Sequence, residues 1–124
     1  MTQLENLIRN LKKANQRLKE AVKAKPTQMN KDATIQRFEF TFELAWKTIQ
    51  AYVIDQGFDC NSPKSCIREG ARLEIIDNPE IWFEYLKARN LIAHTYNEKM
   101  ADKIYKKSLT FPKEVDKLLK NFIG

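Results

Sequence analysis

Apolar residues recur along most of the chain at spacings of three and four, the period of an α-helix that buries one face. The first such stretch runs from about Thr2 to Ala24 and ends before Pro26. Its apolar positions form a single stripe, made of Leu4, Leu7, Ile8, Leu11, Ala14, Leu18, Ala21 and Val22. We therefore predict an amphipathic helix at the start of the chain.

A second helical stretch runs from about Asn30 to Gln56 and stops at Gly57. Its main apolar stripe contains Ile35, Phe38, Phe42, Ala45, Trp46, Ile49 and Val53. Further apolar residues lie outside that stripe, namely Phe40, Leu44 and Ala51. A helix that is apolar on more than one side is buried on more than one side, so the second face is a candidate interface between two copies of the chain.

Two start signals divide the middle of the chain. Ser62 followed by Pro63 is a good cap and first residue for a short helix, which we place at about 63–75. Asn78 and Pro79 repeat that signal and open a fourth helix. Both helices follow loops rich in turn-forming residues, so the boundaries rest on local chemistry as well as on periodicity.

The last part of the chain predicts a bend at Tyr96 and Asn97 and then one more helix, which Pro112 should kink or interrupt. Its apolar positions are Ile104, Tyr105, Leu109, Phe111, Val115, Leu118, Leu119 and Phe122. No alternation typical of β-strands and no internal repeat accompanies these patterns. We predict an all-α, up-and-down bundle of four main helices and one short helix, with residues 1–124 forming a single domain.

Composition narrows the class of protein. Hydrophobic residues make up 43% and charged residues 31% of the 124 positions, which is typical of a soluble globular domain. The sequence contains no run of about 18 apolar residues that could span a membrane, and the first residues lack the apolar stretch of a signal peptide. Cys60 and Cys66 stand six positions apart without the spacing of a zinc site. We expect free thiols in a reducing compartment and a cytoplasmic location.

The net charge of +6 is unevenly distributed. Residues 1–25 carry seven Lys or Arg against two acids, and residues 99–124 carry seven against three, whereas residues 26–98 carry eight against eleven. Basic termini around an acidic middle could attract RNA or an acidic protein. Well-solvated lysine-rich helix faces give the same pattern, so both interpretations stay open.

The stretch 87–99, "KARNLIAHTYNEK", contains the only histidine of the chain. On a helical wheel, Arg89 lies between residues that should face the core, namely Trp82, Leu86 and Ala93. A guanidinium on a core-facing stripe needs a carboxylate, and Glu39 and Glu43 lie one turn apart on the second helix. A buried Arg–Glu pair that fixes helix packing is the structural interpretation of this arginine.

His94 projects about 140° away from Arg89 on an ideal helix. The two side chains converge only if the helix ends or changes its winding between them, or if two copies meet across a two-fold axis. A lone histidine often serves as a structural hydrogen-bonding group or as a cation at a helix C-terminus. RNA cleavage without a metal instead needs a proton acceptor, a proton donor and a cation at the phosphate. Arginine and histidine suit these tasks, and a dimer would supply two histidines.

Several stretches carry a family resemblance. "RNLIAHTY" fits the R-x-x-x-x-H-x-Y signature of HepT-type proteins in the HEPN superfamily. "RFEFTFELAWKTIQAYV", "SPKSCIREG" and "WFEYLKARNLIAHTYNE" look like successive blocks of the nucleotidyltransferase substrate-binding family, which belongs to that group. The resemblance covers about residues 35–105.

The resemblance implies an all-helical homodimer whose motif lines a cleft at the subunit interface, encoded near a minimal nucleotidyltransferase. In a type VII-like toxin–antitoxin pair, such a protein is a metal-independent endoribonuclease, and its partner neutralises it or transfers AMP to the motif tyrosine. By position, Arg89 would bind phosphate and stabilise charge, and His94 would act as acid or base. Asn90 would bind phosphate or hold the histidine, and Tyr96 would accept AMP.

Two other interpretations remain. The chain could be a non-catalytic subunit that binds a substrate or nucleotide for the nucleotidyltransferase, since each of these side chains could equally hold a phosphate. It could also be a plain helical dimerisation domain in which Arg89 pairs with Glu39 or Glu43 as supporting carboxylates. "GARLEIIDNP" has too few glycines for a phosphate-binding loop, and we expect neither a metal nor a cofactor.

Overall fold

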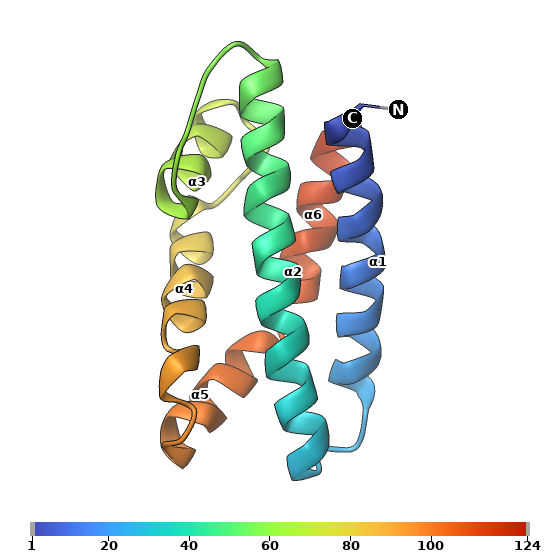
Figure 1. Cartoon of the computed structure of the whole chain (residues 1–124), viewed down its shortest axis with the longest axis vertical. Helices are drawn as coiled ribbons and strands as arrows, with labels where there is room; N and C mark the ends of the chain where they lie inside the picture. The colour runs from blue at the N-terminus through green and yellow to red at the C-terminus, as the bar shows by residue number, and fades with distance from the viewer. Residues whose placement is uncertain (1, 124) are drawn as a thin grey trace.

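A central helix, α2 (Gln28–Asp55), organises the computed structural model, which describes residues 2–123 (Figure 1). On one side of α2 lie α1 (Gln3–Lys23) and α6 (Phe111–Ile123). On the other side lie α3 (Pro63–Arg72) and α4 (Pro79–Asn90). No strand occurs within residues 2–123, and the prediction of an all-α bundle is confirmed.

The helix starts follow the capping chemistry of the sequence. The Ser62 hydroxyl accepts a hydrogen bond from the Ser65 N–H, and the Ser65 side chain accepts from the Ser62 N–H in return, so α3 begins with a capping box. The Asn78 side chain accepts from the first turn of α4. Thr27 caps α2 in the same way, one residue after Pro26 interrupts the helical pattern. These side chains satisfy backbone N–H groups that a helix start leaves without partners.

The C-terminal helix that the sequence suggested is two helices, α5 (Glu98–Ser108) and α6. Pro112 is the second residue of α6, where its missing N–H costs nothing, and its ring excludes a continuous helix through Ser108. The bundle therefore has one more main helix than the four predicted. The short third helix also ends earlier than expected, at Arg72, and Ile75 enters the core from the following loop.

An aromatic cluster holds α2, α4 and α6 together. The ring of Phe111 packs edge-on against Phe38 at a centroid distance of 5.2 Å and against Trp82 at 5.4 Å. Tyr85 approaches the same ring to 4.7 Å, and the Phe111 side chain is fully buried. Burying each such side chain stabilises the fold by about 1.5–3 kcal/mol. This packing fixes the end of α4, because Arg89 follows Tyr85 by one helical turn.

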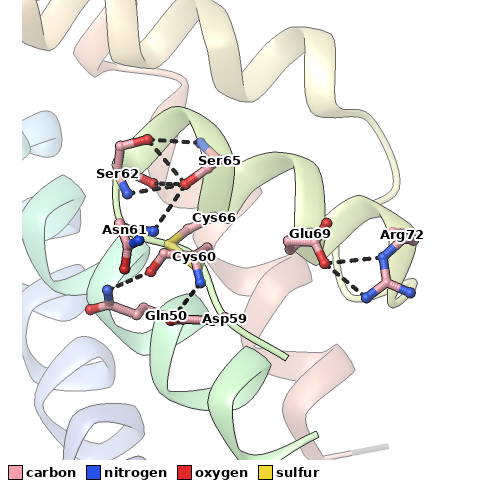
Figure 2. The surroundings of a disulfide bond; sticks show 9 residues. All are labelled: Gln50, Asp59, Cys60, Asn61, Ser62, Ser65, Cys66, Glu69 and Arg72. Atoms are coloured by element: carbon pink, nitrogen blue, oxygen red, sulfur yellow. Dashed lines mark hydrogen bonds and ion pairs between the residues drawn. A yellow bond between two sulfur atoms is a disulfide. The ribbon is translucent and has the colours of Figure 1, made fainter. Parts of the chain in front are cut away.

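The prediction of free thiols is wrong, because Cys60 and Cys66 form a disulfide (Figure 2). The chain turns back at Ser62 and Pro63 to start α3, which brings the two Cα atoms to 5.1 Å. That separation lies within the range that a disulfide requires. The bond joins the loop after α2 to the first turns of α3. The thiol argument for a cytoplasmic location therefore falls away, and that location stays a prediction.

Candidate functional site

Arg89 lies in the last turn of α4 and reaches across to α2. Its Nε–H donates to Oε1 of Glu43 at 2.7 Å, and its Nη2 forms an ion pair with the same oxygen. The guanidinium carbon lies 5.8 Å from the centroid of the buried Phe42 ring. Of the two carboxylates that the sequence offered, Glu43 is the partner, whereas Glu39 is exposed and makes no ion pair with Arg89. The ion pair and hydrogen bond between α4 and α2 thus hold the Arg89 side chain in place.

The carboxylate of Glu43 is held from a second side. Trp46, one turn further along α2, donates its indole N–H to Oε2 at 3.1 Å. Arg89 also donates from Nη1 to Oδ1 of Asn90 at 2.8 Å. A guanidinium carries five N–H groups, and these contacts engage one each on Nε, Nη1 and Nη2. One N–H on each terminal nitrogen is left for a ligand, which suits the bidentate binding of a phosphate.

An open groove of about 1120 Å³ begins at this network and runs between α1, α2 and the end of α4. Its walls carry cations, amides, two carboxylates and several apolar residues. They are Asn10, Lys13, Ala14, Arg17, Ala33, Gln36, Arg37, Glu39, Phe40, Glu43, Leu44, Arg89, Asn90, Ile92 and Ala93. The polar network around Arg89 therefore faces a space large enough for a ligand.

His94 follows a change of winding. The α-helix ends at Asn90, and the backbone tightens into a short 3₁₀ turn, η1 (Ile92–His94), with the His94 N–H donating to the Leu91 carbonyl at 2.9 Å. The ideal wheel therefore fails beyond Asn90, and the prediction that Ala93 faces the core is wrong, because Ala93 is exposed. The His94 side chain is also exposed, and it makes no hydrogen bond or ion pair with other described residues.

Tyr96 stands on the exposed turn between η1 and α5. Its ring meets the His94 ring edge-on at a centroid distance of 6.0 Å, and 83% of the residue is accessible to solvent. Asn97, predicted to mark a bend, caps α5 by accepting from the Met100 N–H at 3.1 Å. One chain therefore brings Arg89, Asn90 and Glu43 into one network, whereas His94 and Tyr96 contact each other on the following turn and do not line the groove.

Sequence reasoning missed part of this site. Trp46 was assigned to the core stripe, yet its indole N–H helps to hold Glu43. The cations Lys13, Arg17 and Arg37 were counted only in the overall charge. A signal for the first two existed, since Asn10, Lys13, Ala14 and Arg17 occur at helical spacing and so share one face of α1. The position of Arg37 in the groove depends on how α1 and α2 pack.

Burial raises the pKa of Tyr85, the aromatic residue one turn before Arg89. Its hydroxyl forms a 2.8 Å hydrogen bond with the Thr110 hydroxyl, between α5 and α6. The phenol is therefore a structural group that stays protonated. Within residues 2–123, no group of three or more His, Cys, Asp or Glu side chains could hold a metal ion. In the same range, no helix has the length and apolar character needed to cross a membrane.

The bundle is a small all-helical domain with an open, partly polar groove. A sequence model of the family described as nucleotidyltransferase substrate binding protein like matches residues 5–122, and the chain belongs to this family. A Thermus thermophilus protein of known crystal structure matches 89% of this chain and 96% of its own, with a TM-score of 0.84 and 32% identity.

Two Haemophilus influenzae proteins are also similar. One structure, described as revealing the fold of a substrate binding domain of a nucleotidyltransferase, matches 98% of this chain and 97% of its own, with a TM-score of 0.66 and 25% identity. A protein named "Probable ribonuclease HepT" is 29% identical over 76 residues. That match spans 57% of this chain and only about half, 52%, of the relative. The family predicted from the sequence is confirmed.

Proposed function

We propose that this chain is the RNA-cleaving subunit of a two-protein module with a minimal nucleotidyltransferase. It acts as a homodimeric, metal-independent endoribonuclease, the toxin of a type VII-like toxin–antitoxin pair. The observation that carries the proposal is the set of contacts that Arg89 makes and its position on the groove. Its guanidinium is fixed by Glu43 and Asn90, keeps two N–H groups for a phosphate, and lies on the groove next to the turn that exposes His94.

The chemistry needs three tasks at one phosphodiester. A base takes the proton from the 2′-hydroxyl, whose oxygen attacks the phosphorus, and an acid protonates the leaving 5′-oxygen. A cation stabilises the charge that develops on the phosphate oxygens, which is the role of Arg89. His94 transfers protons, since an imidazole both accepts and donates them near neutral pH. Because each chain holds one histidine, two copies supply the acid and the base.

An exposed apolar stripe on α2 supports the proposal that two copies of the chain form a dimer. Phe40 is 63% exposed, Ile54 is exposed, and Leu44 and Ala51 are partly exposed between them. Their spacing places them on one face of the helix. Phe40 and Leu44 also line the groove, so a second chain packed on this stripe would close the open side of each groove. A homodimer would thus both bury the stripe and complete the cleft.

The exposed Tyr96 supports control by the partner. Its hydroxyl makes no hydrogen bond within residues 2–123, and its ring contacts His94, so AMP attached there would stand directly beside the proton-transferring group. A bulky anion at that point would repel the RNA phosphate from the histidine. The description of the family and the name of the HepT relative give the proposal its partner and its substrate.

The test is cleavage of a labelled RNA by purified protein in EDTA. The parent and Tyr96→Phe should cleave, because Tyr96→Phe keeps the ring and removes only the acceptor hydroxyl. His94→Ala should not cleave, with unchanged helical circular dichroism and dimer mass. Cleavage that persists in His94→Ala would overturn the mechanism.

A second function has specific support. Arg89 and Asn90 could hold the phosphate of a nucleotide without any catalysis, and a similar structure is described as a substrate binding domain of a nucleotidyltransferase. In that case the chain would present a nucleotide to its partner. Absence of cleavage by the parent, with Tyr96 shown by mass spectrometry to be unmodified and with ATP binding that Arg89→Met removes, would favour this alternative.

A further inference from the structure

Three cations line the groove away from the motif. Lys13 and Arg17 come from α1, and Arg37 comes from α2. All three are exposed, and the side chain of none forms an ion pair or hydrogen bond with other residues of the range 2–123. By contrast, Lys19 points to the other side of α1, where it pairs with Asp116 at 2.8 Å. The groove thus gathers positive charge to which the described residues offer no ion-pair partner.

The register of α1 against α2 orders these cations along the groove. The Thr41 hydroxyl donates to the Ala14 carbonyl at 3.4 Å, and the Thr34 hydroxyl donates to the Ala21 carbonyl at 3.3 Å. The two helices are therefore antiparallel, and Arg17 lies level with Phe38, beside Arg37. Lys13 lies one turn further along, level with Phe42 and next to Glu43, which holds Arg89. The positive charges therefore occupy two levels of the groove, with Arg17 and Arg37 at one level and Lys13 one turn nearer the motif arginine.

We propose that Arg17 and Arg37 at one level of the groove, and Lys13 one turn nearer the motif, bind neighbouring phosphates of a single-stranded RNA and lead its backbone to Arg89. This inference rests on the proposed function and adds the path by which the substrate reaches the site. Cations on both helices of one groove can surround one sugar–phosphate backbone, whereas a duplex presents two backbones. Arginine forks bind phosphate, and the amides of Asn10 and Gln36 offer hydrogen bonds to sugar or base edges without demanding a sequence.

An acidic protein segment fits the groove less well. A docked amphipathic helix needs a continuous apolar floor, but the groove between the cations is floored by small residues, Ala14 and Ala33. The larger apolar residues, Phe40 and Leu44, belong to the exposed stripe of α2 assigned above to the second copy. The groove also contains Glu39, whose carboxylate is exposed and should repel a polyanion. Removing that charge should therefore strengthen RNA binding.

The experiment measures RNA binding as a function of salt. A short fluorescein-labelled single-stranded RNA is titrated with full-length protein in EDTA at several KCl concentrations, and anisotropy gives the affinity. All proteins carry His94→Ala so that the RNA stays intact. The test variant combines Lys13→Gln, Arg17→Gln and Arg37→Gln. The control combines Lys12→Gln, Lys64→Gln and Lys120→Gln, exposed residues outside the groove that remove the same charge.

Each phosphate contact to a single strand contributes about 0.7 to the slope of log affinity against log salt. Losing three contacts should lower the slope by about 2 and weaken binding at 0.1 M KCl roughly 100-fold. The control should keep most of the parent's slope, and Glu39→Gln should bind more tightly than the parent. Equal losses in the test and control variants, or an unchanged slope in the test variant, would overturn the proposal.

Failure of this inference is separable from failure of the proposed function. If RNA binds through the three cations but the protein with intact His94 cleaves nothing, the ribonuclease assignment fails and the path stands. If that protein cleaves RNA while the triple variant binds and cleaves normally, only the path fails. A labelled polyglutamate peptide tests the other partner class, and tighter binding of the peptide than of RNA would also overturn the inference.

Discussion

Replacing Glu43 by Gln tests whether the carboxylate fixes the motif arginine. The substitution preserves size but removes the charge, and its amide group places an N–H donor against a donor of either Arg89 or Trp46. Hydrogen bonds to charged groups are worth about 1.5–3 kcal/mol. The side chains of Arg89 and Glu43 are 26% and 35% exposed, so solvent weakens the pair. We therefore expect a coupling of about 1–2 kcal/mol between the two residues.

The assay is a double-mutant cycle. Urea unfolding gives the free energy of unfolding of the parent, Glu43→Gln, Arg89→Met and the double variant, and the non-additive part is the coupling. The matched control is the cycle of Glu84→Gln with Lys107→Met, whose ion pair has a carboxylate side chain that is 60% exposed. That pair should couple by less than about 0.5 kcal/mol.

The same variant links stability to activity. In Glu43→Gln the arginine keeps its charge but loses its fixed direction, and misplacement by about 1 Å can cost a reaction about 100-fold. Cleavage should fall by roughly tenfold to 100-fold, with RNA affinity nearly unchanged. The reasoning is refuted if the cycle gives additive free energies within about 0.3 kcal/mol, or if cleavage proceeds at the parent's rate.

Three further predictions concern Tyr85, the disulfide and Tyr96. Burial raises the pKa of Tyr85, so the folded state keeps the phenol proton that the unfolded chain loses above about pH 10. The free energy of unfolding, measured with urea, should therefore fall more steeply between about pH 9.5 and 11 in the parent than in Tyr85→Phe. Parallel pH profiles of the two proteins would contradict this. Replacing both Cys60 and Cys66 by Ser should cost about 2 kcal/mol, because the disulfide closes a short loop, and dithiothreitol should lower the parent's urea midpoint but not the variant's. Tyr96→Phe should change the free energy of unfolding by less than about 0.5 kcal/mol, since the residue is mostly exposed. Mass spectrometry should show no transfer of AMP to the Tyr96→Phe protein by the nucleotidyltransferase. If this variant were adenylylated, the AMP acceptor would be another residue.

The sequence predicts most of the fold because its signals are local. Capping by Ser62 and Asn78, the breaks at Pro26 and Pro112, and the apolar spacing together locate the helices. The exit from α4 has no such signal. No glycine or proline occurs between Asn90 and Asn97, and "RNLIAHTYN" keeps apolar residues at helical spacing, so the helical wheel placed Ala93 in the core. The 3₁₀ turn could not be predicted, because neither the residue types nor the apolar spacing of this stretch indicates it.

The partner of Arg89 illustrates what spacing cannot decide. Glu39 and Glu43 lie one turn apart on the same face of α2, so the sequence offers both equally. The choice depends on how far α4 extends along α2, which the packing of Tyr85 and Phe111 sets. The disulfide was missed for a similar reason, since only the reversal of the chain at Pro63 brings the two sulfurs together.

The structural and functional interpretations of Arg89 are not alternatives. Its contacts to Glu43 and Asn90 engage three of the five N–H groups and join α4 to α2, as a packing residue would. The same contacts hold the guanidinium at the place where Arg89 lines the groove, and a fixed position is what binding of a developing phosphate charge requires. Under the proposed function, this partly buried ion pair between two helices also supports the group that binds phosphate. A purely structural role of Arg89 would not explain the three cations of the groove. It would also not explain the exposed side chains of His94 and Tyr96.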